Sequence, residues 1–96
     1  SLDGNLHNQI FDRIFAMLVN EAADALMMGI ATAADIETAM TKGVNYPQGL
    51  LAWANKRGLR TVYNKLDDLF AYYGEDRYRV CPLLRKLALN DEMFRI

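Results

Sequence analysis

Apolar residues recur at helical spacing along almost the whole chain, and glycines and prolines interrupt the pattern at intervals. The clearest stretch follows the i, i+3, i+4, i+7 rule of an amphipathic helix, at Leu59, Val62, Tyr63, Leu66, Leu69, Phe70 and Tyr73. No segment alternates apolar and polar residues for long enough to predict a β-strand. The sequence therefore predicts an all-α fold, with residues 1–96 forming one domain of about five helices.

The first predicted helix is the longest and runs from about Leu6 to Met28. Its expected core face comprises Phe11, Phe15, Leu18, Ala22, Ala25 and Leu26, with Ile14 and Val19 at the edges. Gly29 is placed to end this helix in a left-handed conformation. Met17 and Met27 fall among the polar positions, and exposed methionines can mark a contact surface. We therefore take these two methionines as candidate interface residues.

The remaining helix boundaries follow from capping residues. "TAAD" at 32–35 resembles a capping box, in which Thr32 caps and Asp35 replaces the usual glutamate, and this helix should end near Gly43. A short helix, "LLAWANKR", precedes Gly58, and the helix of residues 59–73 precedes Gly74. Pro82 suits the first position of "PLLRKLAL". We expect the last residues, "NDEMFRI", to fray.

The stretch "GVNYPQG" at 43–49 predicts a stiff corner between the second and third helices. Pro47 disfavours a helical conformation at Tyr46, and Gly49 permits a tight turn. We expect the corner to pack Tyr46 onto the long helix, together with Leu50, Leu51 and Trp53, and we assign it Asn20, Glu21, Asn45, Tyr46, Pro47 and Gly49. Glu21 has two interpretations: a solvated residue, or a carboxylate that accepts hydrogen bonds from the corner's backbone.

Charge and hydrophobicity argue against nucleic acid as a partner and against a membrane span. The chain has 11 basic and 12 acidic residues, whereas a nucleic-acid site needs a concentrated basic face. A DNA-binding role for the helix from Ala33 to Lys42 is disfavoured because that helix offers Glu37 and one lysine. No apolar run approaches the length of about 20 residues that a membrane span needs. The hydrophobic fraction of 52% suggests that some apolar surface contacts a partner.

Residues for catalysis or for metal and cofactor binding are sparse. His7 is the only histidine, Ser1 the only serine, and no glycine-rich phosphate-binding motif is present, so we expect no metal, no cofactor and no catalytic residue in this chain. The single Cys81 excludes an internal disulfide and fits a reducing cytoplasm. We interpret Ser1-Leu2 as an expression scar, residues 1–4 as a disordered start, and the chain as a fragment of a longer protein.

Four stretches together resemble a known family. In order, "MLVNEAADAL", "IATAADIETAM", "KGVNYPQGLLAW" and "RYRVCPLLRKLA" are similar to the C-terminal helical domain of 3-hydroxyacyl-CoA dehydrogenases, over about residues 6–89. The resemblance implies the helical fold of 6-phosphogluconate dehydrogenase C-terminal domains. It also implies a parent enzyme that oxidises the 3-hydroxyl of an acyl-CoA with NAD. In such enzymes a separate Rossmann domain holds the NAD, and the helical domain closes over the acyl-CoA and commonly forms a dimer.

The resemblance also shows a departure at Asp12. Aligning on "NEA" places Phe11-Asp12-Arg13 where the family has "VNR", so Asp12 occupies the position of an active-site asparagine. An ionised aspartate accepts hydrogen bonds but cannot donate them, and its charge would oppose a developing oxyanion. Tandem family members carry a second helical copy that resembles this chain better, and Gln48 and Leu50 are further departures. We interpret the chain as such a non-catalytic copy, of the 3-hydroxybutyryl-CoA or 3-hydroxyadipyl-CoA dehydrogenase type; the alternative is a free-standing helical interaction module.

Overall fold

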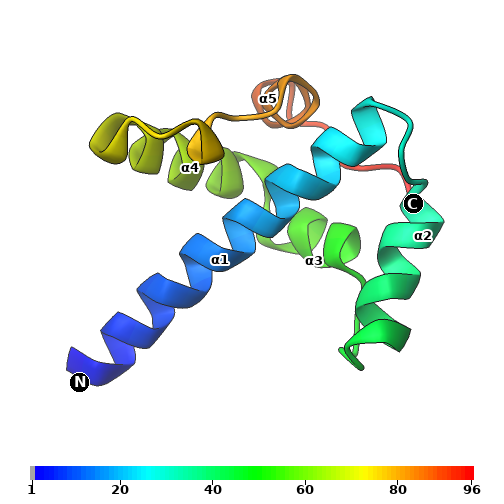
Figure 1. The fold of residues 1–96 in the computed structure, drawn as a ribbon, viewed down its shortest axis with the longest axis horizontal. Coiled ribbons are helices and arrows are strands. Elements are labelled where there is room, and N and C mark those ends of the chain that lie inside the picture. Colours follow the sequence, from blue (N-terminus) through cyan, green and yellow to red (C-terminus); the bar gives the residue numbers. More distant parts are fainter. Residues whose placement is uncertain (1) are drawn as a thin grey trace.

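The computed structural model describes residues 2–96, with side chains from residue 4 onward, and this range contains helices and turns without a strand. The elements in order are α1 (Leu2–Met27), α2 (Ala33–Thr38), the π-helical turn η1 (Ala39–Gly43), α3 (Leu50–Arg57), α4 (Leu59–Tyr73), the 3₁₀ turn η2 (Asp76–Tyr78) and α5 (Pro82–Leu89). α1 crosses the molecule and contacts α3, α4 and α5, whereas α2 packs on α3 (Figure 1). The predicted all-α class with five α-helices is confirmed.

The long helix α1 begins earlier than predicted and ends as predicted. It starts at Leu2, so it includes residues 2–4 of the expected disordered start, and Ser1 lies outside the described residues. At its other end Gly29 has φ +70°, its N–H donates to the Leu26 carbonyl over 3.2 Å, and the Ile30 N–H donates to the Ala25 carbonyl over 2.9 Å. These two bonds are the Schellman motif, which satisfies carbonyls left free at a helix end.

The face that α1 buries differs from the predicted one. Its buried residues are Phe15, Ala16, Val19, Ala22 and Ala23, and the three alanines allow neighbouring helices to approach closely. Two residues of the predicted core face, Phe11 and Leu18, are instead 37% and 42% exposed. α1 carries two apolar faces, and the one with the smaller side chains packs into the core. The prediction favoured the larger side chains and was wrong for this part of the helix.

The predicted boundaries of α3, α4 and α5 are confirmed, whereas α2 begins as predicted but ends at Thr38, and the π-helical turn η1 continues to Gly43. The Asp35 N–H donates to the Thr32 hydroxyl over 3.1 Å, and the Thr32 N–H donates to the Asp35 carboxylate over 3.3 Å, which completes the capping box at α2. Gly74, at φ +66°, ends α4, and Pro82 occupies the first turn of α5. The core face of α4 is also confirmed at its four buried positions, although Tyr73 is 44% exposed.

The C-terminal segment is anchored to the domain, and the expectation that it frays was wrong. Phe94 is buried in the core, and the Asn55 side chain holds its backbone at both polar groups. The Phe94 N–H donates to Asn55 Oδ1 over 2.8 Å, and Asn55 Nδ2 donates to the Phe94 carbonyl over 2.9 Å. The side-chain amide thus bonds to the backbone as a neighbouring β-strand would, with one donor and one acceptor. This pair of bonds fixes the C-terminal segment against α3.

Candidate functional site

The corner at residues 43–49 is held by a carboxylate that the sequence did not point to. Glu37 on α2 accepts two backbone hydrogen bonds from the first turn of α3: Leu51 N–H to Oε1 over 2.6 Å, and Ala52 N–H to Oε2 over 3.1 Å. The N-terminus of a helix has unpaired N–H groups and a partial positive charge, so an anionic acceptor stabilises it there. Glu37 therefore caps α3 from the preceding helix, which ties α2 to α3.

Gly49 permits this cap by leaving room for the carboxylate. Gly49 is the N-cap residue of α3 and offers no side-chain acceptor of its own. A β-carbon added at Gly49 would overlap the Glu37 carboxylate. The backbone of Gly49 has φ −72°, which any residue adopts, so the requirement for glycine comes from close approach. The left-handed position in the corner belongs to Asn45, with φ +61°.

An aromatic cluster connects the corner to α1. The Trp53 ring lies with its centroid 5.0 Å from Phe15, 5.5 Å from Phe11 and 5.8 Å from Tyr46. The expected packing of the α3 residues on α1 is thus present, and Leu51 is fully buried. Tyr46 reaches α1 through Trp53, and 43% of its surface stays exposed. The corner therefore fixes α3 against α1 while leaving an aromatic edge at the surface.

Asn20 and Glu21 lie away from this corner. Asn20 Nδ2 donates to the Arg79 carbonyl over 2.8 Å, and the Cys81 N–H donates to Asn20 Oδ1 over 2.8 Å, so Asn20 fixes the turn before α5. Glu21 is exposed and lines the same polar surface pocket as Asn20. The cap that we considered for Glu21 is supplied by Glu37, whose half-buried carboxylate binds the first turn of α3.

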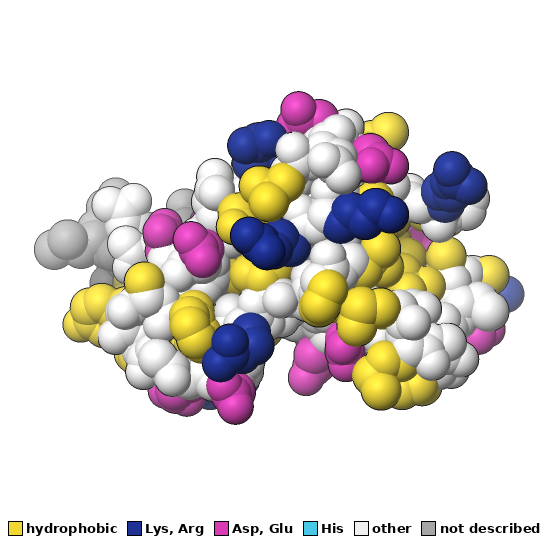
Figure 2. All heavy atoms as spheres, turned by 90° about the horizontal axis from the view of Figure 1, so that it is seen from above, with side chains coloured by type: hydrophobic (Ala, Val, Ile, Leu, Met, Phe, Trp, Pro, Cys, Tyr) yellow, Lys and Arg dark blue, Asp and Glu magenta, His cyan; other side chains and the backbone are white. Residues whose placement is uncertain are grey.

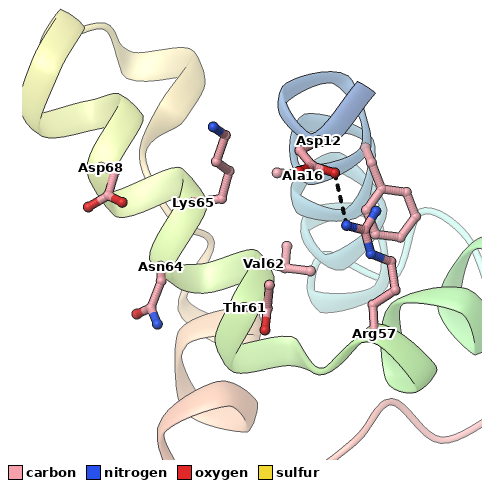
Figure 3. Close-up of a pocket in the computed structure, with 9 residues that line it drawn as sticks. Asp12, Ala16, Arg57, Thr61, Val62, Asn64, Lys65 and Asp68 are labelled. Carbon is pink, nitrogen blue, oxygen red and sulfur yellow. Dashed lines mark hydrogen bonds and ion pairs between the residues drawn. The ribbon is translucent and has the colours of Figure 1, made fainter. Parts of the chain in front are cut away.

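Asp12 lies at a cleft of about 270 Å³ between α1 and α4, and the end of α3 closes one side of it (Figure 3). Its Oδ1 lies 2.8 Å from Arg57 Nη2, and the Arg57 guanidinium also stacks over the Phe11 and Phe15 rings at 5.6 and 5.0 Å. Lys65 rises between the two helices, whereas Asn64 and Asp68 point away from the ion pair (Figure 3).

The chemistry available in this cleft is limited. The carboxylate of Asp12 already accepts from Arg57, and half-exposed pairs of this kind contribute about 0–1 kcal/mol to stability. Neither histidine, cysteine nor serine lines the cleft. The ion pair therefore ties the middle of α1 to the end of α3, and the other ionisable residues that line the cleft, Lys65 and Asp68, lie on α4.

An apolar groove of about 580 Å³ lies on the other side of Phe15. Helix α1, the segment from α2 through η1 to the corner, and the start of α3 form its walls, and we call it the apolar groove; its lining residues are Phe11, Ile14, Phe15, Leu18, Ile36, Ala39, Met40, Val44, Tyr46, Leu50 and Trp53. None of these residues is charged, so the groove suits an apolar occupant. Periodicity alone missed it, because it assigned Phe11 and Leu18 to the core.

The candidate interface methionines are both at least partly accessible. Met17 is half-buried at the edge of the polar pocket near Asn20, and Met27 is 45% exposed with its Sδ 4.0 Å from Cys81 Sγ. Neither lines the apolar groove. The apolar groove therefore lies elsewhere than at these two residues.

Charged side chains of both signs occur together on the face that Figure 2 draws. In the connector between α4 and α5, which contains the turn η2, Arg77 pairs with Glu75 at 2.8 Å, Arg79 pairs with Asp76 at 3.0 Å, and Tyr78 is buried. Among the described residues, no group of three or more His, Cys, Asp or Glu side chains is arranged to hold a metal ion. Within the same range, no helix combines the length and the apolar character that crossing a membrane requires.

Comparison with known proteins gives a consistent result over most of the chain. Residues 10–95 match the family model described as "3-hydroxyacyl-CoA dehydrogenase, C-terminal domain". The chain is 52% identical over 77 residues to 3-hydroxyadipyl-CoA dehydrogenase of Escherichia coli K12, a match that covers 80% of the chain and 16% of that protein. It is 36% identical over 77 residues to a probable 3-hydroxybutyryl-CoA dehydrogenase of Bacillus subtilis, covering 80% of the chain and 27% of that protein.

A solved structure supports the same relationship. The crystal structure of 3-hydroxybutyryl-CoA dehydrogenase from Escherichia coli K12 superposes with a TM-score of 0.77 at 51% identity, over 81% of the chain and 16% of that protein. The chain thus spans a minor part of the length of the relatives it matches.

Proposed function

Because this chain belongs to the family of 3-hydroxyacyl-CoA dehydrogenase C-terminal domains, we propose that it is the structural and dimerising domain of an NAD-dependent enzyme that oxidises the 3-hydroxyl of an acyl-CoA to a 3-ketoacyl-CoA. The parent enzyme would bind NAD in a separate Rossmann domain, since no strand–glycine loop–helix unit occurs in the described residues. The chain's partners are then the rest of that dehydrogenase and a second copy. We place the enzyme in the cytoplasm, which the free thiol of Cys81 fits.

The observation that best supports a structural role is the ion pair that Asp12 forms. It takes the position of the family's active-site asparagine and is paired with Arg57, so it is not free to donate to a substrate oxygen. To take part in catalysis, this domain would need a hydrogen-bond donor at that position, whereas the chain has a hydrogen-bond acceptor that is already paired. We therefore propose that chemistry happens in other domains of the parent enzyme.

The lengths of the relatives support a second, tandem copy. A match of 77 residues makes up 16% of the Escherichia coli protein, and a match of the same length makes up 27% of the Bacillus subtilis protein, so the first protein is considerably longer. Its greater length leaves room for a further helical domain, and identity to this chain is higher in that protein. This supports the assignment of the chain to the tandem type.

The test uses the full parent enzyme and follows NAD reduction with 3-hydroxybutyryl-CoA and with 3-hydroxyadipyl-CoA. We expect Asp12→Asn to leave kcat and KM within about twofold of the wild type, because the residue contributes through an ion pair worth about 0–1 kcal/mol. A loss of kcat of about 100-fold or more in this variant, with the fold intact by circular dichroism, would return the chain to the active site.

A further inference from the structure

The segment from α2 to the corner lies against the domain without adding a buried residue to its core. Of the described residues 32–46, which we call the flap, none is buried, whereas α1, α3, α4 and α5 all bury side chains. Ala33, Ile36 and Met40 are the half-buried side chains through which the flap contacts the core. α2 packs on η1 and α3, and Figure 1 shows it at the edge of the molecule, away from α4. Segments with few buried apolar contacts open more readily than the core does.

Hydrogen bonds within the flap hold it together as one unit. The capping box closes the first turn of α2, and Thr41 Oγ1 donates to the Glu37 carbonyl over 3.0 Å, which joins η1 to α2. The Tyr46 N–H donates to the Met40 carbonyl over 3.1 Å, which joins the corner to η1. The flap can therefore move without losing these bonds.

Glu37 joins the flap to α3 through one carboxylate. Its two oxygens accept from the N–H groups of Leu51 and Ala52, over 2.6 and 3.1 Å. Each bond pairs an anion with an N–H group at the positive end of a helix, so each is stronger than a bond between neutral groups. Because both bonds end on one side chain, they are lost together when the flap moves away from α3.

Turns flank the flap on both sides. Residues 29–31 follow the end of α1, where Gly29 has φ +70°, and residues 47–49 precede α3. Hinges are a few loop or helix-terminal residues that absorb a change of backbone angles. These two turns are therefore placed to serve as the hinges of the flap.

We propose that the flap opens as a unit about these turns while the core stays folded, and that the Glu37 carboxylate is the latch that must be released first. The flap forms one wall of the apolar groove, opposite α1 and α3, through Ile36, Ala39, Met40, Val44 and Tyr46. Opening moves this wall away from α1, so the flap sets the width of the groove. An apolar occupant that contacts both walls then favours the closed flap.

Hydrogen exchange read by mass spectrometry tests the opening of the flap in this chain. In the wild type we expect flap amides to exchange at least about tenfold faster than the amides of α4. Their exchange should also depend less on added urea, because opening the flap exposes less surface than unfolding the whole domain.

Two variants release the latch from opposite sides. Glu37→Ala removes the carboxylate and should make flap exchange faster by at least about tenfold, because two charge-assisted bonds are lost. Gly49→Ala displaces the same carboxylate and should act in the same direction. Glu21→Ala is the matched control, since Glu21 is an exposed glutamate on α1, and it should leave flap exchange unchanged. Flap exchange that stays unchanged in both latch variants would overturn the role of Glu37.

Val62→Ala separates flap opening from unfolding of the whole domain. Val62 is buried in α4, so its truncation weakens the core equally whether the flap is closed or open. Exchange in α4 should therefore become faster, while exchange in the flap stays within about twofold of the wild type. If flap amides respond to Val62→Ala as strongly as those of α4, the flap opens only when the domain unfolds, and the proposal is wrong.

Discussion

At the scale of single residues, the interaction between Glu37 and Gly49 decides how α2 meets α3. The Glu37 carboxylate accepts from both the Leu51 and the Ala52 N–H groups, and it reaches them across Gly49. Sequence periodicity could not find it, because Glu37 lies on a helix of six residues that buries none of its own side chains. The available signal was the glycine at the N-cap of α3: a helix capped by glycine needs its acceptor from elsewhere.

Gly49→Ala tests this interaction. The added methyl group would displace the Glu37 carboxylate, so we expect a loss of about 1–3 kcal/mol of unfolding free energy, the cost of leaving partly buried N–H groups without their charged acceptor. Urea denaturation followed by circular dichroism measures it.

Gly43→Ala is the control for this substitution, since a β-carbon there meets no atom within 4 Å and its φ is not in the left-handed region. We expect Gly43→Ala to be neutral or to stabilise by about 0.4–1 kcal/mol. Equal effects of the two substitutions would show that Gly49 matters only for backbone entropy.

The Asp12–Arg57 pair is expected to contribute little to stability. Because 42% of the Asp12 side chain and 31% of the Arg57 side chain are exposed, Asp12→Ala should cost less than about 1 kcal/mol at low salt, and the cost should shrink as salt is added. Thermal unfolding at two salt concentrations measures this. A salt-independent loss of more than about 2 kcal/mol would mean that Asp12 supports the fold by a contact other than the ion pair.

At the scale of helices, prediction succeeded where a helix has one apolar face. The pattern of α4 correctly included its four buried residues, because the other face of this helix is polar from Arg60 to Asp68. The pattern of α1 is ambiguous, since large apolar residues lie on one side and alanines on another. The larger side chains led us to predict that the wrong side of α1 is buried. Only the packing of the neighbouring helices determines that Ala16 and Ala23 are buried. The prediction for the C-terminal segment was wrong for a similar reason, because no local sequence pattern indicates that Asn55 binds Phe94.

Asn55→Ala should release the C-terminal segment. Two hydrogen bonds to the Phe94 backbone are lost, so residues 91–96 should exchange their amide hydrogens much faster, and unfolding free energy should fall by about 1–3 kcal/mol. Hydrogen exchange read by mass spectrometry measures the segment directly. Asn64→Ala, an exposed asparagine on α4, is the control. If both variants protect the tail as the wild type does, the burial of Phe94 suffices to hold it.

At the scale of the whole molecule, the domain combines a neutral, ion-paired cleft with an open apolar groove. The fold class and the order of helices could be predicted, because turn residues and capping signals divide the chain clearly. The groove could not, because it is formed by α1, η1 and α3 together and depends on which side of α1 is buried. This arrangement suits a domain that is assembled into a larger enzyme through apolar contacts.

Titration calorimetry of this chain with NAD and with an acyl-CoA tests the central claim, that the domain is structural. We expect no binding heat for either ligand, because Asp12 is occupied by Arg57 and no dinucleotide-binding unit occurs in the described residues. Binding of the acyl-CoA that disappears in Asp12→Ala would contradict the account and make Asp12 a substrate contact.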